Sequence, residues 1–152
     1  MNAAATYEQD YSPEQAELAE RIVGLEKDAL NKWFKGDVSG YRELWSRKSF
    51  TYFDGDNPDR VEDHDTIDRF LDKLSGKLYA DAYDFRNPRV QFGADTALLT
   101  FQLYADTNLI DMKYNCVELY QKEADGKWRV IHSTWSFIRP MDMDFSTAKE
   151  IV

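Results

Sequence analysis

Two carboxylates and one histidine on predicted strands are the residues best suited to acid–base chemistry. Glu118 lies in the run 112–122, Asp54 ends the short run SFTYFD, and His132 lies in the final run KWRVIHSTWSF. A carboxylate that is partly removed from water has a raised pKa and can serve as a general base or acid, and histidine titrates near neutral pH. These residue types indicate proton transfer, or the binding of a ligand amine or hydroxyl group.

Each of these residues also has a purely structural alternative. Glu118 stands near a strand end, where it can reach solvent or pair with a lysine or arginine. Asp54 precedes Gly55 and Asp56, so it can simply form a turn. His132 can hydrogen-bond across a sheet or at a subunit interface. Glu118 and His132 can act together only if they share one face of the sheet, which the sequence does not fix.

Other reactive residue types form no catalytic motif. Asp63, His64 and Asp65 are adjacent in sequence, and adjacent residues on a helix point in different directions, so we expect no metal site. Cys116 is the single cysteine, and we expect it to be a buried, small apolar residue. We find no glycine-rich phosphate loop, nucleophile elbow or P-loop, and therefore expect no cofactor.

Three helices are predicted in the first half of the chain. The first spans 12–36, because Ser12 and Gln15 can form a capping box and apolar residues then recur at helical spacing up to Trp33. A second, shorter helix follows a cap at Asp37. A third begins at a cap on residue 63 or 65 and ends near residue 76.

From residue 79 onward the apolar period changes to two. Strands are predicted at 83–92, 96–105, 112–122 and 127–138, after an earlier one at 49–54. Asp125-Gly126 is the strongest hairpin signal among their connections. Asn87-Pro88 predicts an edge strand or a bulge. Helices gathered on one side of a long antiparallel sheet make an α+β fold.

Length and charge restrict the classes of partner. The 152 residues suit one domain, and the net charge of −9 argues against nucleic acid or an anionic membrane as partner. The single cysteine, and an amino terminus with neither a basic nor an apolar leader segment, lead us to expect a cytoplasmic protein. We expect a flexible amino-terminal segment at 1–11, a folded domain at 12–140 and a tail at 141–152.

Three segments carry a resemblance to a known family: ALNKWFKGDVSGYRELWS, FTYFD and the closing hairpin DGKWRVIHSTWSF. With the element order, they resemble the NTF2-like superfamily, in particular its SnoaL-like and DUF4440-type members, and the association domain of calcium/calmodulin-dependent kinase. The resemblance implies a conical α+β fold, a curved antiparallel sheet packed against three helices. It also implies a homodimer formed through the convex sheet face and a pocket at the wide end of the cone. The closest patterns have a second histidine where this chain has Thr134.

The faces of the last strands decide which residues line that pocket. Strict alternation gives the last strand one face with Val130, His132, Thr134 and Ser136, and another with Ile131, Ser133, Trp135 and Phe137. Sequence alone does not choose between them. Similarity to the kinase association domain implies that Glu118 and Trp135 point inward, and that His132 and Thr134 lie on the interface side or in an alternative pocket. The expected pocket residues are Trp33, Tyr52, Phe101, Leu103, Tyr114, Cys116 and Trp135.

Three functional hypotheses follow. The first is a homodimeric protein that binds a small, partly apolar molecule in an aromatic pocket. The second is a cofactor-independent lyase or isomerase that uses Glu118 or Asp54 as general base, with Tyr52 or Tyr114 donating to an oxyanion. The third is a homo-oligomerisation module, for which we expect a large apolar convex face and no enclosed cavity. The fold does not choose among them.

Overall fold

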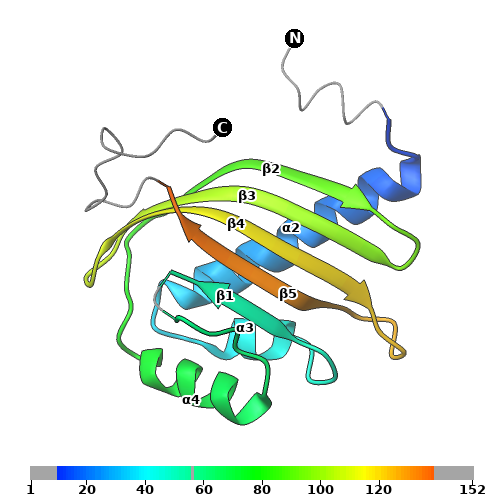
Figure 1. Ribbon diagram of the computed structural model, residues 1–152. Helices are drawn as coiled ribbons and strands as arrows, with labels where there is room; N and C mark the ends of the chain where they lie inside the picture. Colours follow the sequence, from blue (N-terminus) through cyan, green and yellow to red (C-terminus); the bar gives the residue numbers. More distant parts are fainter. Residues whose placement is uncertain (1–9, 56, 139–152) are drawn as a thin grey trace, which may run out of the picture.

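The computed structural model describes residues 10–55 and 57–138 of the chain. The helices are α2 (Pro13–Trp33), α3 (Ser39–Leu44) and α4 (His64–Leu74), and the strands are β1 (Thr51–Asp54), β2 (Asp84–Phe92), β3 (Thr96–Asp106), β4 (Asp111–Lys122) and β5 (Trp128–Phe137) (Figure 1). Every predicted helix and strand is present, with ends that differ by a few residues. The predicted α+β fold is confirmed.

Short-range polar contacts begin the helices. The backbone N–H of Gln15 donates to the Ser12 hydroxyl at 3.1 Å, and the Ser12 N–H donates to the Gln15 side chain at 3.0 Å, which completes the capping box of α2. Of the two predicted caps for α4, Asp63 is the one used, since it accepts from the Thr66 N–H at 2.8 Å. The predicted cap at Asp37 was wrong by one residue: Val38 is the N-cap of α3 and makes no side-chain cap bond, while Asp37 accepts from the N–H of Ser39 at 2.9 Å in the turn before the helix.

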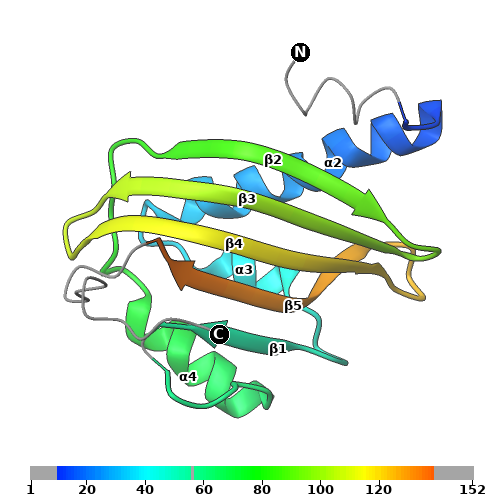
Figure 2. The ribbon, with the colours of Figure 1, turned by 45° about the horizontal axis from the view of Figure 1, so that its top comes forward.

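The five strands form one sheet in the order β1-β5-β4-β3-β2 (Figure 2). Strands β2 to β5 are an antiparallel meander, as predicted. The sheet is nevertheless mixed, because β1 pairs with β5 in parallel, which the sequence did not indicate. Strand β2 is an edge strand, its register shifts between Arg86 and Arg89, and Asn87 has a φ of 53°. Asn87-Pro88 therefore lies at both an edge and an irregularity.

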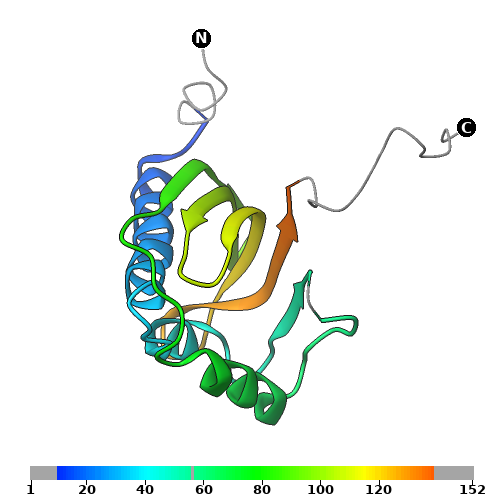
Figure 3. The ribbon, with the colours of Figure 1, turned by 90° about the vertical axis from the view of Figure 1, so that its left-hand side faces the viewer.

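The sheet curls around the helices. Figure 3 shows α2 and α3 on the concave side of the sheet. Helix α4 lies beside β1, the edge strand opposite to β2. The main core fills the space between them and includes Ile22 and Leu30 of α2, Tyr41 of α3, and Leu99 and Leu103 of β3, all almost completely buried. The helices thus cover the concave face, and most side chains that point inward from β3, β4 and β5 are buried.

A bulge in β5 corrects one part of the predicted face assignment. Leu119 pairs with His132, but the next residue, Tyr120, pairs with Val130, so Ile131 is the extra residue. Because one extra residue changes the parity of a strand, Val130 is fully buried on the same side as Ser133, not on the side of His132. Strict alternation was therefore wrong at the start of β5, and correct from His132 onward.

The ends of the predicted domain fall largely outside the described residues. The expected tail at 141–152 and all but the last two residues of the expected flexible segment at 1–11 lie outside the described residues. Tyr11, which the sequence places in the amino-terminal segment, donates from its hydroxyl to the carbonyl of Val90 and packs edge-on against the ring of Phe92. Within the described part of the chain, no helix has the length and apolar character needed to span a membrane.

Candidate functional site

A cavity of about 180 Å³ lies at the end of the cone where β1, β5 and the β3–β4 turn meet the helices. Its wall comes from every layer of the fold. The lining residues are Trp33, Tyr41, Trp45, Tyr52, Asp54, Phe70, Leu74, Leu78, Leu109, Ile110, Met112, Tyr114 and Trp135. The volume is below the range of roughly 300–1,000 Å³ of pockets that hold drug-sized ligands, so the cavity suits a compact molecule.

Among the described residues, Asp54 is the one charged residue in this wall. It ends β1 and accepts from the backbone N–H of Asn57 at 2.8 Å, so it forms a turn, as the structural alternative predicted. Its side chain also borders the cavity. Tyr52 lies two residues earlier on the same strand. Burial, and then the neighbouring Asp54 carboxylate, raise the pKa of Tyr52 well above its ordinary value, so the phenol stays protonated and can donate.

Glu118 lies behind the cavity wall and not in it. Its side chain is fully buried, and its Oε1 accepts from the Ser133 hydroxyl at 2.6 Å. Ser133 in turn accepts from the indole N–H of Trp135, a wall residue, at 2.8 Å. Register explains the chain of contacts, because Glu118 pairs with Ser133 and the two side chains share the inner face.

Glu26 is a second buried carboxyl that the sequence reasoning missed. It lies on α2, is fully buried, and neither of its carboxyl oxygens has a hydrogen-bond partner among the described residues. The signal was present in the sequence, since Glu26 falls four residues after Ile22 and four before Leu30, on the apolar stripe of the helix. Tyr41, a wall residue, is near enough for its hydroxyl to lower the pKa of Glu26, without reaching hydrogen-bond geometry.

These two carboxyls are held in the neutral form by their surroundings. Burial raises the pKa of Glu26 to about 8, and the smaller effect of the Tyr41 hydroxyl is to lower this pKa. Burial also raises the pKa of Glu118 well above its ordinary value, the nearby Glu26 raises it further, and the Ser133 hydrogen bond opposes both. An ionised carboxylate without a partner is costly in such an interior, so the protonated acids are favoured.

His132 and Thr134 lie on the outer face of the sheet. The two ring nitrogens of His132 are hydrogen-bonded to the hydroxyls of Thr51, at 2.7 Å, and Thr134, at 2.6 Å. Burial, and then Arg60, lower the pKa of His132. Because Glu118 pairs with Ser133 while His132 pairs with Leu119, the two titratable groups are on opposite faces and cannot form one acid–base pair.

The structure distributes the expected pocket residues between the wall and the core. Trp33, Tyr52, Tyr114 and Trp135 line the cavity. Phe101, Leu103 and Cys116 are buried on the same inner face but are not part of this wall. Burial raises the pKa of the Cys116 thiol, so it stays uncharged. Among the described residues, no three histidine, cysteine, aspartate or glutamate side chains are grouped so as to hold a metal ion.

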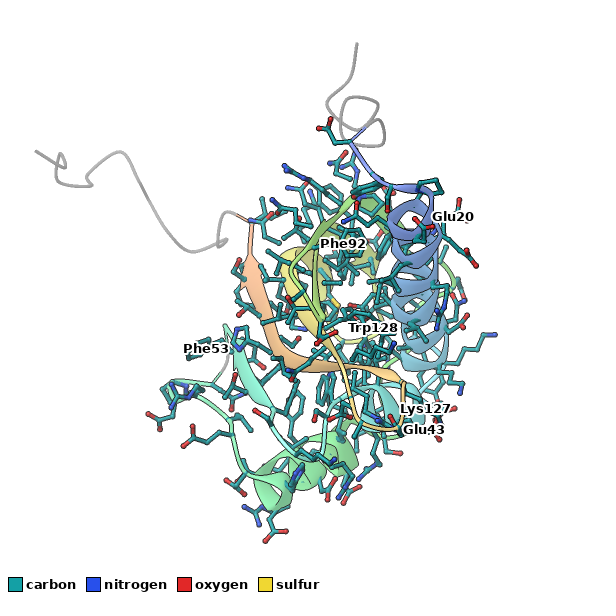
Figure 4. The ribbon with its side chains drawn as sticks, turned by 90° about the vertical axis from the view of Figure 1, so that its right-hand side faces the viewer. Glu20, Glu43, Phe53, Phe92, Lys127 and Trp128 are labelled. Carbon is teal, nitrogen blue, oxygen red and sulfur yellow. The ribbon has the colours of Figure 1, made fainter. Side chains whose placement is uncertain are left out.

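A larger, open groove of about 920 Å³ lies at the opposite end of the sheet. Its walls are α2, α3 and the β4–β5 hairpin, and Figure 4 labels three of its lining residues, Glu43 of α3 and Lys127 and Trp128 of the hairpin. Charges of both signs line the groove, and Arg129 is paired with Glu123 at 2.7 Å and with Asp125 at 2.9 Å. This groove offers no enclosed, apolar environment, so the aromatic cavity is the stronger candidate for a ligand site.

The family model of the SnoaL-like domain matches residues 27–140 of this sequence. This chain belongs to the SnoaL-like domain family. The match covers all five strands of the sheet and the described cavity wall, so the predicted resemblance to SnoaL-like proteins of the NTF2-like superfamily is confirmed. No curated protein matches the sequence.

Solved structures agree with this membership. A ketosteroid isomerase candidate from Parabacteroides distasonis is 28% identical, with a TM-score of 0.72, over 87% of this chain and 96% of that one. An NTF2-like protein of unknown function from Pseudomonas putida is 15% identical, with a TM-score of 0.69, over 83% of this chain and 90% of that one. The CaMKII hub of S. rosetta is 18% identical, with a TM-score of 0.64, over 84% of this chain and 98% of that one. At these identities the last two show the fold alone.

Proposed function

We propose that this SnoaL-like domain binds a small, partly apolar molecule in the aromatic cavity. The observation that carries the proposal is the composition of the wall: twelve of the thirteen lining residues are aromatic or aliphatic, and the remaining one is Asp54. Such a wall gains free energy when it excludes water around an apolar body, while Asp54 and Tyr52 supply polar contacts that orient it. A pure oligomerisation module would not need an aromatic cavity of this kind.

A block at the rim tests this proposal. Leu109 lines the cavity but is 56% exposed, so Leu109→Trp can fill the entrance without disturbing the core. We expect p-cresol, indole and cyclohexanone to bind the wild type in saturation-transfer NMR, and expect Leu109→Trp to abolish that signal. Phe53→Trp is the control, because Phe53 is also exposed and apolar but lies outside this cavity. Unchanged binding to Leu109→Trp would contradict the proposed site.

A second candidate is a cofactor-independent lyase or isomerase. It is supported by the isomerase candidate at 28% identity and by the proximity of Asp54 to the Tyr52 hydroxyl, a carboxylate base beside an oxyanion donor. Binding ranks first because neither carboxyl with a raised pKa lines the cavity: Glu118 bonds to Ser133 behind the wall, and Glu26, beside Tyr41, makes no hydrogen bond to it. Deuterium exchange into the α-carbons of cyclohexanone in D₂O, lost in Asp54→Asn, would favour the enzyme.

We also propose a homodimer formed through the outer face of the sheet. The side chains there include Leu98 of β3, Val117 and Leu119 of β4, and the His132–Thr51 pair, all only half-buried in the single chain. An apolar strip of this kind on a soluble protein marks an interaction surface. Likeness to the CaMKII hub supports the fold required, and nothing finer about assembly.

A further inference from the structure

Aromatic rings make up more than half of the described cavity wall. Seven of the thirteen lining residues are aromatic: Trp33, Tyr41, Trp45, Tyr52, Phe70, Tyr114 and Trp135. The face of each ring carries partial negative charge, which attracts a cation within about 6 Å of the ring centre. Three tryptophans are present, and tryptophan is the strongest of the aromatic residues in this interaction.

Neighbouring rings of the wall are either tilted or nearly perpendicular, and the tilted pairs are Tyr41–Trp45, Trp45–Tyr52 and Tyr52–Phe70 at 39–42°. The ring centres of Trp33 and Tyr41 are 5.2 Å apart at 88°, and those of Tyr41 and Trp135 are 6.3 Å apart at 85°. Tyr114 and Trp135 are 5.8 Å apart at 88°. The rings of the wall therefore lie in several different planes around the cavity.

The charge around the cavity has one sign. Asp54 lines it, and no lysine, arginine or histidine does so among the described residues. Behind the wall, Glu118 is linked to Trp135 through Ser133 and Glu26 lies beside Tyr41; both are held neutral, so neither adds a positive charge and the charge of Asp54 is the one that a ligand meets. An anionic ligand would lose its hydration and meet a carboxylate, whereas a cation would exchange water for that carboxylate and the ring faces.

We propose that the ligand of this cavity is a small organic cation, an alkylammonium or methylated ammonium group on a compact apolar body. This inference rests on the proposed function of the same cavity and narrows its ligand class. The ammonium group is placed against Asp54 and the aromatic faces, and the body against Leu74, Leu78 and Met112. A bare metal ion does not fit, because a single lining carboxylate cannot replace its hydration shell.

Two probes of equal shape test the charge directly. Choline and 3,3-dimethylbutan-1-ol differ in one atom, a quaternary nitrogen in place of a quaternary carbon. Isothermal titration of the wild type at constant ionic strength should show choline binding at least about tenfold tighter, the gain expected for a cation among desolvated aromatic faces. This comparison needs no variant, so it is independent of any effect of mutation on folding.

Asp54→Asn then tests the carboxylate. We expect this variant to lose about tenfold in affinity for choline and to leave that for 3,3-dimethylbutan-1-ol nearly unchanged. Asp95→Asn is the matched control, because Asp95 is an exposed aspartate in the β2–β3 turn, at the other end of the sheet. Leu109→Trp should remove the binding of both probes.

The outcomes separate this inference from the function beneath it. Equal affinity for the two probes, lost in Leu109→Trp, would leave the cavity as the ligand site and overturn the cationic ligand. Binding of p-cresol or indole with no binding of choline would likewise leave the cavity as the ligand site and overturn the cationic ligand. Choline binding that survives Leu109→Trp would overturn both, because the cation would then bind elsewhere on the acidic surface.

Discussion

At the scale of single residues, Glu26 and Glu118 distinguish this protein most clearly. Both carboxyls are fully buried, and no lysine or arginine is bonded to either of them in the described part of the chain. Removing an acid from water without a counter-charge costs free energy that protonation avoids. The two acids therefore couple the stability of the fold to pH, independently of any ligand.

The sign of that dependence follows from Glu26. Its pKa is raised from 4.5 to about 8 on folding, so between these values the folded protein holds a proton that the unfolded chain has lost. The free energy of unfolding should then fall as pH rises from about 4.5 to about 8, by on the order of a few kcal/mol. Urea unfolding at pH 5 and at pH 8.5 measures this fall in the free energy of unfolding.

Glu26→Gln removes the titrating group and keeps its size. We expect this variant to flatten a large part of the pH dependence, with the remainder carried by Glu118. Glu20→Gln is the control, because Glu20 is exposed on the same helix and labelled on its outer side in Figure 4. An equal pH dependence in wild type and Glu26→Gln would mean that Glu26 does not hold its proton in the folded state.

At the scale of elements, the turn after β1 fixes one side of the cavity. Gly55 follows Asp54, and a Cβ atom at this glycine would lie 2.2 Å from the ring of Phe137 at the end of β5. That ring is stacked on Tyr114, a wall residue, with centres 4.9 Å apart. Close packing of Gly55 on Phe137 therefore connects the position of Asp54 to the aromatic wall.

Gly55→Ala should disturb both stability and binding. The methyl group must displace Phe137 or the turn, so we expect a loss of about 1–3 kcal/mol in the free energy of unfolding and weaker binding of p-cresol. Gly24→Ala is the contrast, since no atom lies within 4 Å of a Cβ at that helical position, and it should stabilise α2 by roughly 0.5–1 kcal/mol. A Gly55→Ala protein as stable as the wild type would show that the turn relaxes freely.

At the scale of the whole molecule, the proposed homodimer interface on the outer face of the sheet can be tested. A charge on the outer sheet face should separate a dimer that uses it, because a desolvated, unpaired ammonium is costly at an interface. Leu119 points outward from β4, opposite His132. We expect Leu119→Lys to be monomeric in analytical ultracentrifugation and to keep the wild-type circular dichroism spectrum.

Leu109→Lys controls for the general effect of the new charge. Leu109 is an exposed leucine in the β3–β4 turn, away from the outer sheet face, so this variant should sediment like the wild type. A wild-type protein that is monomeric at all concentrations, or a Leu119→Lys protein that still dimerises, would contradict the proposed interface.

The sequence alone predicts where the secondary-structure elements lie and which of them are helices or strands. Capping residues such as Ser12 and Asp63, the apolar period, and turn signals such as Asp125-Gly126 act over a few residues, so they can be recognised without knowing the fold. The family resemblance rested on the same segments, and the edge position of Asn87-Pro88 followed from the missing N–H of proline.

Tertiary structure decided what surrounds each reactive side chain. The bulge at Ile131 reversed the alternation of β5, the parallel pairing of β1 placed Asp54 at the cavity, and the packing of α2 against the sheet brought Glu26 toward Glu118. These outcomes depend on contacts between residues far apart in the chain. A local pattern gives the face of an element, but the electrostatic environment of a carboxyl is set by whatever is packed against that face.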